Sequence, residues 1–350
     1  MNWEQAKQFA IDAIMAKAIP HLIGKPGVGK SSIYSSIAKD YRLKFLDVRL
    51  NCRESVDLSG YPSLDTVNKV AQYIPFEEFP IEGETPLPAG YDGWLLCLDD
   101  FDAADPHMQK ACMKLLLGRQ VGMKTLHNKC IVVTAGNRVQ DRAGAFANNT
   151  AIQSRMVHAN VESSFDGWLT GFALKAKMDP DVIGFLASKP DMLNDFDPAH
   201  TNLTYACERT WETFDRFKKI WETKYTTPEL MQENCLEAAS GIIGPAAATE
   251  FFTWLTVRKD LPKLADVLAN PLGHPLPQDM GVMFMFLSIA SQNINVADFP
   301  KFLDFVQRAP AELQVFANRI VTARCPNVVR LQAFTDWATK VGALVNGVTI

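Results

Sequence analysis

The sequence has few of the residues that would build a disulfide framework or a metal site from its own side chains. Its seven cysteines are odd in number and scattered, and none stands in a Cys-x-x-Cys pair. The six histidines are equally dispersed, without the His-Glu-x-x-His spacing of zinc ligands. These patterns argue against a disulfide scaffold or a zinc centre and favour reduced, mostly buried thiols in a cytoplasmic protein.

A large excess of charge and a long apolar run are missing as well. The net charge is −4, so no overall positive field draws the chain toward DNA or an anionic membrane, although local basic patches stay possible. The first ten residues lack the charged-then-apolar pattern of a signal peptide. The most apolar long stretch, 238–257, contains Gly241, Gly244, Pro245 and Glu250, which favours a buried helix over a membrane span.

What is present divides the chain into two parts. In the first 165 residues, apolar segments of strand character alternate with helical patterns, which favours a parallel sheet with helices on both faces. The expected strands are 19–23, 44–50, 94–100 and 129–137, and the expected helices include 31–41 and 106–118. From about residue 166 onward the periodicity is helical. Within the first part, residues 60–93 are rich in proline and predict a long irregular loop.

The segment GKPGVGKSS, residues 24–32, carries the clearest chemical signal. Gly24, Gly29, Lys30 and Ser31 satisfy the pattern G-x-x-x-x-G-K-[ST] between an apolar strand and a helix. Glycines let backbone N–H groups face an anion, and the helix directs its positive end at the phosphates. Lysine neutralises phosphate oxygens, and the serine hydroxyl takes one Mg²⁺ position. We therefore predict a nucleotide and Mg²⁺ at this loop, with these binding residues: Gly24, Pro26, Gly27, Val28, Gly29, Lys30, Ser31 and Ser32.

Two further apolar segments end in polar side chains. WLLCLDD ends on Asp99 and Asp100, and we expect Asp99 to hold Mg²⁺ and Asp100 to orient the attacking water. VVTAGN ends on Asn137, whose amide reaches the terminal phosphate or this water if its strand lies beside that of Asp99. Asparagine is also common at the start of a turn, so that assignment depends on the strand order. A motif that reads guanine, Asn/Thr-Lys-x-Asp, is absent, which disfavours a GTPase.

Together these residues resemble the AAA+ ATPase superfamily, and specifically its MoxR-like branch. The resemblance includes VRLNCRESVDLSGYP (48–62), LDDFDAADPHMQKACMKLLLGRQV (98–121) and TAGNRVQDRAGAFANNTAIQSRMVHANVE (134–162). It extends more weakly through the helical half of the chain. It implies an ATP-hydrolysing α/β core at 1–165, a helical lid at 166–262 and a C-terminal helical extension at 263–350. It also implies a helix-2 insert at 60–93 and a pre-sensor-1 hairpin at 118–129.

The resemblance assigns roles to polar residues that composition alone would leave on the surface. Asn137 corresponds to sensor 1, and Arg155 to the arginine finger that reaches the terminal phosphate of a neighbouring subunit. Arg142 is a second candidate for the finger, and Arg209 corresponds to sensor 2 on the lid. A finger supplied in trans couples hydrolysis to assembly, which implies a homo-oligomeric ring and, by family habit, a hexamer.

Two departures from the family pattern bear on activity. The second acid is Asp100 instead of glutamate, which favours slower hydrolysis unless Asp102 shifts the local arrangement. The Ser-Pro that typically precedes the sensor-2 arginine is replaced around Arg209 by CERTWE.

We therefore expect a ring ATPase that remodels or activates a protein partner, by resemblance one with a von Willebrand A-type domain. Tyr61, Tyr73 and Phe76 of the insert are candidates for substrate contact, or else they pack within their own loop. Two other functions stay open, a nucleic-acid motor and a scaffold that binds ATP to assemble but scarcely hydrolyses it. A small-molecule kinase would share the glycine loop but would not explain Asn137, Arg155 and the helical half together.

Overall fold

The computed structural model describes the chain except for residues 68, 142–149, 257–260 and 347–350. The chain divides into two compact units. The first comprises Met1–Ser163 together with Phe196–His200, and the second comprises Ser164–Asp195 together with Thr201–Ile350. Each unit has its own apolar interior.

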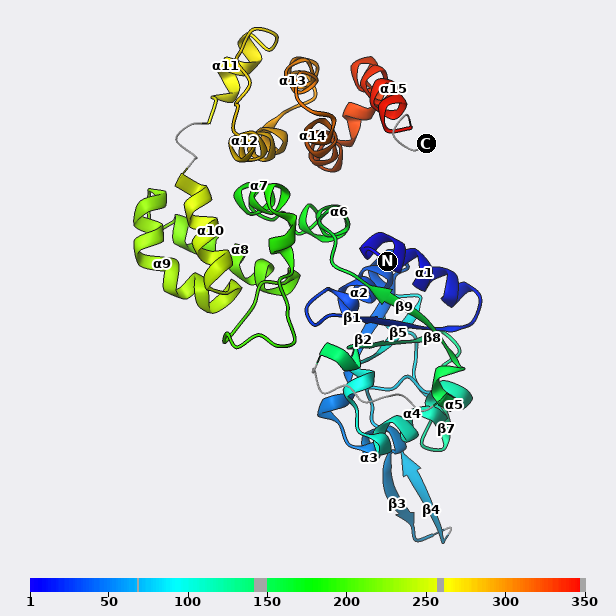
Figure 1. Cartoon of the computed structure of the whole chain (residues 1–350). Coiled ribbons are helices and arrows are strands. Elements are labelled where there is room, and N and C mark those ends of the chain that lie inside the picture. The colour runs from blue at the N-terminus through cyan, green and yellow to red at the C-terminus, as the bar shows by residue number, and fades with distance from the viewer. Residues whose placement is uncertain (68, 142–149, 257–260, 347–350) are drawn as a thin grey trace. The chain divides into compact units, whose positions relative to one another are not determined.

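A five-stranded sheet forms the centre of the first unit, in the order β2-β5-β8-β1-β9 (Figure 1). Its strands are β1 (Ile19–Gly24), β2 (Leu43–Arg49), β5 (Gly93–Asp99), β8 (Cys130–Gly136) and β9 (Met156–Val161). Each neighbouring pair is parallel. The carboxyl ends of the strands therefore meet at one edge of the sheet, and loops leaving this edge can share a site.

Helices cover both faces of the sheet, as the alternation of segments predicts. Along β5, Leu95 and Cys97 pack with α1 (Trp3–Met15) and α2 (Lys30–Asp40). Leu96 and Leu98 point the other way, toward the cluster of α3 (Ser55–Ser59), α4 (Pro106–Gly118) and α5 (Thr150–Gln153). Every residue of β5 is buried, as expected for a central strand of a parallel sheet. This arrangement confirms the α/β fold class.

Two local features differ from the sequence-based expectation. Strand β9 was not predicted, because burial at Met156, Ala159 and Val161 follows no regular period. The proline-rich segment 60–93 is not wholly irregular, since it contains an antiparallel hairpin of β3 (Tyr61–Asp65) and β4 (Val70–Ile74). All residues of β4 are exposed and those of β3 are exposed or half-buried, so no apolar alternation marks these strands.

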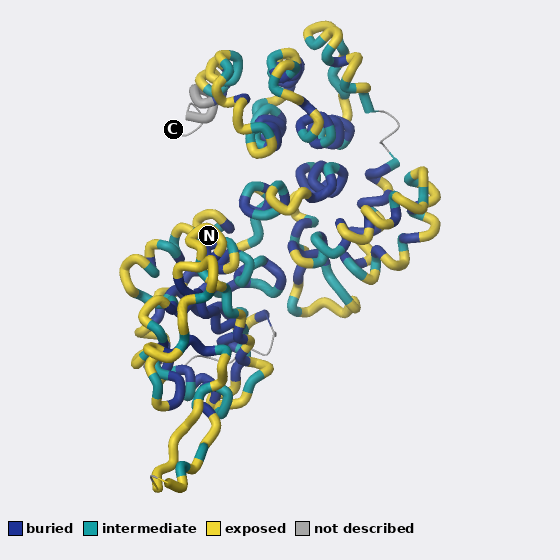
Figure 2. The backbone as a smooth tube through the Cα atoms, turned by 180° about the vertical axis from the view of Figure 1, so that it is seen from behind, coloured by how far each residue is buried: buried dark blue, intermediate teal, exposed yellow. Residues whose placement is uncertain are grey.

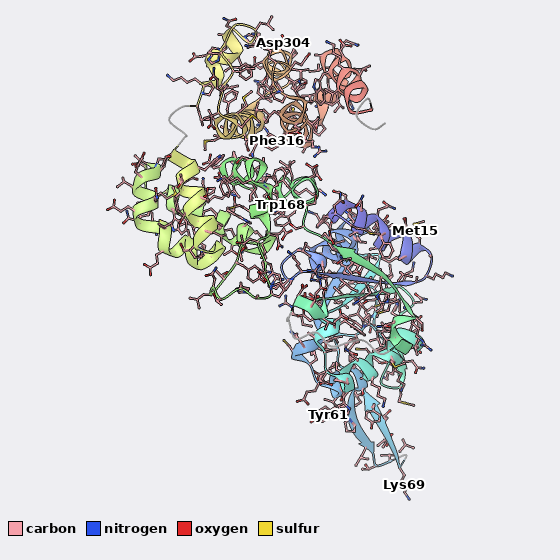
Figure 3. The ribbon with its side chains drawn as sticks, viewed as in Figure 1. Met15, Tyr61, Lys69, Trp168, Asp304 and Phe316 are labelled. Carbon is pink, nitrogen blue, oxygen red and sulfur yellow. The ribbon has the colours of Figure 1, made fainter. Side chains whose placement is uncertain are left out.

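This hairpin projects from the rest of its unit, as Figures 1 and 2 show. Figure 3 labels Tyr61 near its base and Lys69 at its tip. A second, much shorter hairpin, β6 (Gln120–Val121) with β7 (Lys124–Thr125), packs against the base of the first. The Gly122 N–H donates to Leu58 O at 3.1 Å, and a Cβ on Gly122 would lie 2.4 Å from Ser59 O. The two segments that the sequence suggested as inserts also contact each other, because the His127 N–H donates to Pro80 O at 2.9 Å and the Glu82 N–H donates to Thr125 O at 3.0 Å.

The second unit is helical, which confirms the expectation for this half of the chain. Its longer helices are α7 (Pro180–Ser188), α8 (Glu208–Glu222), α9 (Pro228–Ile243), α10 (Pro245–Leu255), α12 (Met280–Asn293), α13 (Phe299–Val306), α14 (Ala311–Arg324) and α15 (Gln332–Asn346). The unit also contains the short helices α6 (Phe165–Trp168) and α11 (Leu264–Ala269). One apolar cluster runs from Trp168 to Val341 and includes residues from both the expected lid and the expected extension. The subdivision between residues 262 and 263 stays a prediction.

Candidate nucleotide site

The glycine loop connects β1 to α2 at the carboxyl edge of the sheet. Gly27 and Gly29 have φ values of 82° and 89°, in the left-handed region that favours glycine. Gly24 serves a different purpose, because a Cβ there would lie 2.4 Å from Val161 O of β9. Two of the loop glycines are thus needed for backbone conformation and one for close packing between strands.

Lys30 begins α2, and its side chain is 7% exposed. Its Nζ donates to Gly24 O and Lys25 O, each at 3.0 Å, and to Asn137 Oδ1 at 2.9 Å. The cation is therefore held at the mouth of the loop and connected to the end of β8. An ammonium group in this position can neutralise the charge of a bound phosphate chain.

Ser31 and Asp99 face each other across the same edge. Ser31 Oγ donates to Asp99 Oδ2 at 2.5 Å, and Asp99 is 9% exposed at the end of β5. Elsewhere in the loop, Ser32 Oγ donates to Gly29 O at 2.7 Å, and Val28 is buried in the core beside α2. Pro26 is half-buried.

Asp100 follows with a left-handed backbone, φ 52° and ψ 34°. Its N–H donates to Asp99 Oδ1 at 2.9 Å, and Asn137 Nδ2 donates to Asp100 Oδ1 at 3.3 Å. Asn137 therefore contacts Lys30 through one amide atom and Asp100 through the other. The strand order explains this, since β8 lies between β1 and β5 and delivers Asn137 between the two. From the sequence, the role of Asn137 depended on its strand lying beside that of Asp99. Strands β8 and β5 are such neighbours.

Residues 21–156 match the family model described as ATPase family associated with various cellular activities (AAA). The chain carries an AAA ATPase domain. A comparison with curated proteins found no match. In the part of the chain that the structure describes, no helix has both the length and the apolar character needed to cross a membrane.

The oxygen groups of the AAA domain suit Mg²⁺, the ion that an AAA nucleotide site typically employs. Magnesium is usually held through one or two carboxylates together with substrate phosphates, and Ser31 Oγ and Asp99 supply one hydroxyl and one carboxylate side by side. Among the described residues there is no group of three or more His, Cys, Asp or Glu side chains placed to hold a metal by themselves. Ser31 and Asp99 thus fit a metal that arrives with its nucleotide.

Two ionisable groups beneath the AAA site are held neutral. Burial, followed by the charge of Asp99, raises the pKa of the Cys97 thiol well above its ordinary value. Burial also raises the pKa of Tyr34, whose hydroxyl donates to Thr134 O at 2.9 Å and Pro20 O at 3.1 Å. Neither group adds negative charge where phosphates are expected to bind.

The structure describes two of the three predicted arginines, and both are exposed. Arg155 is exposed between α5 and β9, with its N–H donated to Ile152 O at 3.0 Å. Arg142 lies outside the described residues. Arg209 is exposed in the first turn of α8 and belongs to the helical unit. The roles of these arginines as finger and sensor 2 stay predictions.

Sequence reasoning assigned no role to two residues beneath the AAA site, His21 and Thr134, and named Asp102 only as an acid that shifts the local arrangement of Asp100. His21 of β1, Thr134 of β8 and Asp102, just past Asp100, form a buried polar network. A histidine inside the apolar segment IPHLI was the available signal, because a buried imidazole needs polar partners.

Proposed function

We propose that the chain is a MoxR-like AAA+ ATPase that hydrolyses Mg-ATP at the subunit interfaces of a homo-oligomeric ring and so remodels or activates a protein partner. The observation that carries the hydrolytic part is the position of Asn137, which contacts both Lys30 and Asp100. The MoxR-like part rests on the resemblance of the ordered motifs along the chain.

Each residue of the constellation has a chemical task in this proposal. Lys30 neutralises oxygens of the terminal phosphates, and Asp100 accepts a proton from the attacking water. Asn137 orients this water and the terminal phosphate. Mg²⁺, held through Ser31 and Asp99, would supply positive charge that polarises the phosphate. Arg155 of a second copy stabilises the charge that develops on the transferred group, so that turnover requires assembly.

The exposed hairpin of the first unit supports a protein as the partner. Its exposed apolar residues are Tyr61, Leu64, Val67, Val70, Tyr73 and Ile74, and Phe76 follows directly. Tyr61 is 65% exposed and Tyr73 is 47% exposed, so neither residue is buried by packing within its own loop. Apolar surface of this kind commonly marks a contact with another protein. A von Willebrand A-type domain is the partner that the resemblance suggests.

Turnover assays test the hydrolytic site. We expect Lys30→Ala to lower ATP turnover by about a hundredfold or more, because the phosphate charge loses its buried counter-ion. Lys39→Ala, at the exposed end of the same helix, is the matched control and should turn over like the parent. A parent that binds ATP yet does not turn it over, while Asp100→Glu does, would favour the ATP-gated scaffold instead.

Mixing two inactive variants tests the ring. Lys30→Ala retains Arg155, and Arg155→Ala retains Lys30, so about a quarter of the interfaces in a random equimolar mixture would be intact. We expect such a mixture to regain turnover that neither variant shows alone. Mixing Lys30→Ala with the double variant Lys30→Ala, Arg155→Ala should restore nothing. A chain that stays monomeric with saturating Mg-ATP, or an Arg155→Ala variant as active as the parent, contradicts the ring.

The partner is tested separately. Affinity purification from the native host should recover a von Willebrand A-type protein, and its absence removes this partner while leaving the ATPase proposal intact. Turnover that is stimulated by DNA with a steep dependence on salt would support the nucleic-acid motor instead.

A further inference from the structure

A buried polar network lies directly beneath the proposed hydrolytic site. His21 Nδ1 contacts Thr134 Oγ1 at 2.8 Å, and His21 Nε2 contacts Asp102 Oδ2 at 3.1 Å. His21 and Thr134 are 0% exposed, and Asp102 is 4% exposed. The network connects β1, β8 and the turn that follows β5. Burying three polar side chains costs free energy unless they are paired. The contacts among His21, Thr134 and Asp102 offset this cost.

The carboxylate of Asp102 also rests on the backbone that carries Asn137. A Cβ on Gly136 would lie 1.6 Å from Asp102 Oδ2, so any larger residue at position 136 would displace this carboxylate. Phe101, between Asp100 and Asp102, is 0% exposed, and its ring centroid lies 5.8 Å from that of His21. The two residues after Asp100 are therefore both anchored in the interior.

The left-handed backbone of Asp100 needs support from the buried residues on either side of it. A non-glycine residue in the left-handed region is disfavoured and persists where its surroundings determine the conformation. On one side the Asp100 N–H is bound by Asp99 Oδ1. On the other side Phe101 and Asp102 are held by packing and by His21. This conformation directs the Asp100 carboxylate to Asn137.

We infer that His21 and Asp102 are positioning residues for ATP hydrolysis, which they serve by holding Asp100 in the left-handed conformation that places its carboxylate against Asn137. The inference rests on the proposed hydrolytic function. Neither residue touches nucleotide in this scheme. Phosphate binding by Lys30, Ser31 and Asp99 is therefore separable from the effect of the network.

The test is a comparison of turnover with affinity. We expect Asp102→Ala to lower kcat at least tenfold, while KM and the affinity for a fluorescent ATP analogue stay within about twofold of the parent. Asp102→Asn keeps an oxygen that can accept a hydrogen bond from His21 and should retain most of the turnover. Asp181→Ala removes an equally buried carboxylate in the helical unit and should lower the thermal midpoint without changing kcat.

A double-variant cycle with Asp100→Asn shows whether the effect passes through Asp100. If it does, adding Asp102→Ala to Asp100→Asn causes no further loss of turnover. A crystal structure of Asp102→Ala should show residue 100 outside the left-handed region.

The contrary outcomes distinguish failure of the positioning role from failure of the proposed function. Should Asp102→Ala not fold, the variant His21→Leu with Asp102→Ala removes both polar partners together and must show the same loss of kcat. Turnover like the parent in either variant, a loss confined to nucleotide affinity, or an additive loss in the cycle overturns the positioning role. A parent chain without any ATP turnover overturns the proposed function itself.

Discussion

The side chain and the backbone conformation of Asp100 together determine how its carboxylate reaches Asn137. Its side chain is one methylene shorter than the glutamate typical of the family that the sequence resembles. Its left-handed backbone brings the carboxylate to 3.3 Å from Asn137 Nδ2. The backbone of one residue thus determines whether a short carboxylate can join the site.

Cysteines provide a prediction at the same scale. Burial raises the pKa of both the Cys112 and the Cys130 thiol from 9.0 to about 12. In the folded state these thiols keep their protons between pH 9 and 12, whereas unfolded thiols ionise. Their contribution to stability is therefore complete below pH 9 and is lost as the pH rises toward 12.

We expect the free energy of unfolding to fall by about 1 kcal/mol per thiol between pH 8 and pH 10 because of this ionisation. Urea unfolding at the two pH values measures it. The variant Cys112→Ala, Cys130→Ala should show a shallower dependence on pH, whereas the exposed Cys52→Ala should match the parent. An identical pH dependence in all three proteins contradicts the prediction.

At the scale of elements, the two hairpins of the first unit differ in what holds them. The short hairpin of β6 and β7 is tied to the core by the bridge between Ile81 and Leu126 and by the bond from Gly122 to Leu58. In the long hairpin, no residue of β3 or β4 is buried. The short hairpin is therefore part of the packed unit, whereas the long hairpin adds little to its apolar interior.

We predict that the long hairpin can be removed without unfolding its unit. Tyr61 and Ile74 are cross-strand partners, so Asn-Gly in place of residues 62–73 closes a two-residue turn. The thermal midpoint should stay within a few degrees, and ATP-analogue affinity should not change, because little apolar area is lost. Binding of the protein partner should be lost. A large drop in the midpoint would show that the hairpin stabilises the fold instead.

At the scale of the whole molecule, each unit has its own means of stabilisation. The first unit buries both faces of a parallel sheet. The second packs helices around one apolar cluster and also contains a buried ion-pair network, in which Lys218 Nζ lies 3.0 Å from Asp179, 3.0 Å from Asp181 and 2.7 Å from Glu222.

Burial lowers the pKa of Lys218, but Asp181, Asp179 and Glu222 outweigh this effect, so the pKa lies above its ordinary value. Because the folded-state pKa is raised, the stabilisation is fully present below the ordinary pKa of 10.5 and is lost only as the pH rises through the raised value. At neutral pH the ammonium group is therefore charged and compensates its carboxylates.

We expect Lys218→Met to destabilise the helical unit by about 3–5 kcal/mol, because it leaves buried carboxylates without their counter-ion. Arg216→Met is the matched control on the same helix. Its guanidinium lies 3.8 Å from Glu212 Oε1, and the two side chains are 64% and 40% exposed, so its loss should cost about 1 kcal/mol or less. Calorimetric unfolding of both variants measures the two losses of stability. Equal losses would contradict a special role for the buried lysine.

The sequence by itself determined what depends on neighbours along the chain. The glycine loop, the acids Asp99 and Asp100, most sheet strands and the helical second half are all local patterns, since loop conformation and apolar period act over a few residues. Tertiary structure alone decided which strands lie side by side. The placement of β8 between β1 and β5 joins Asn137 to Lys30 and Asp100, and the same packing buries His21 against Asp102. No local pattern specifies such contacts, because they join residues between 37 and 107 positions apart and arise only when the sheet assembles.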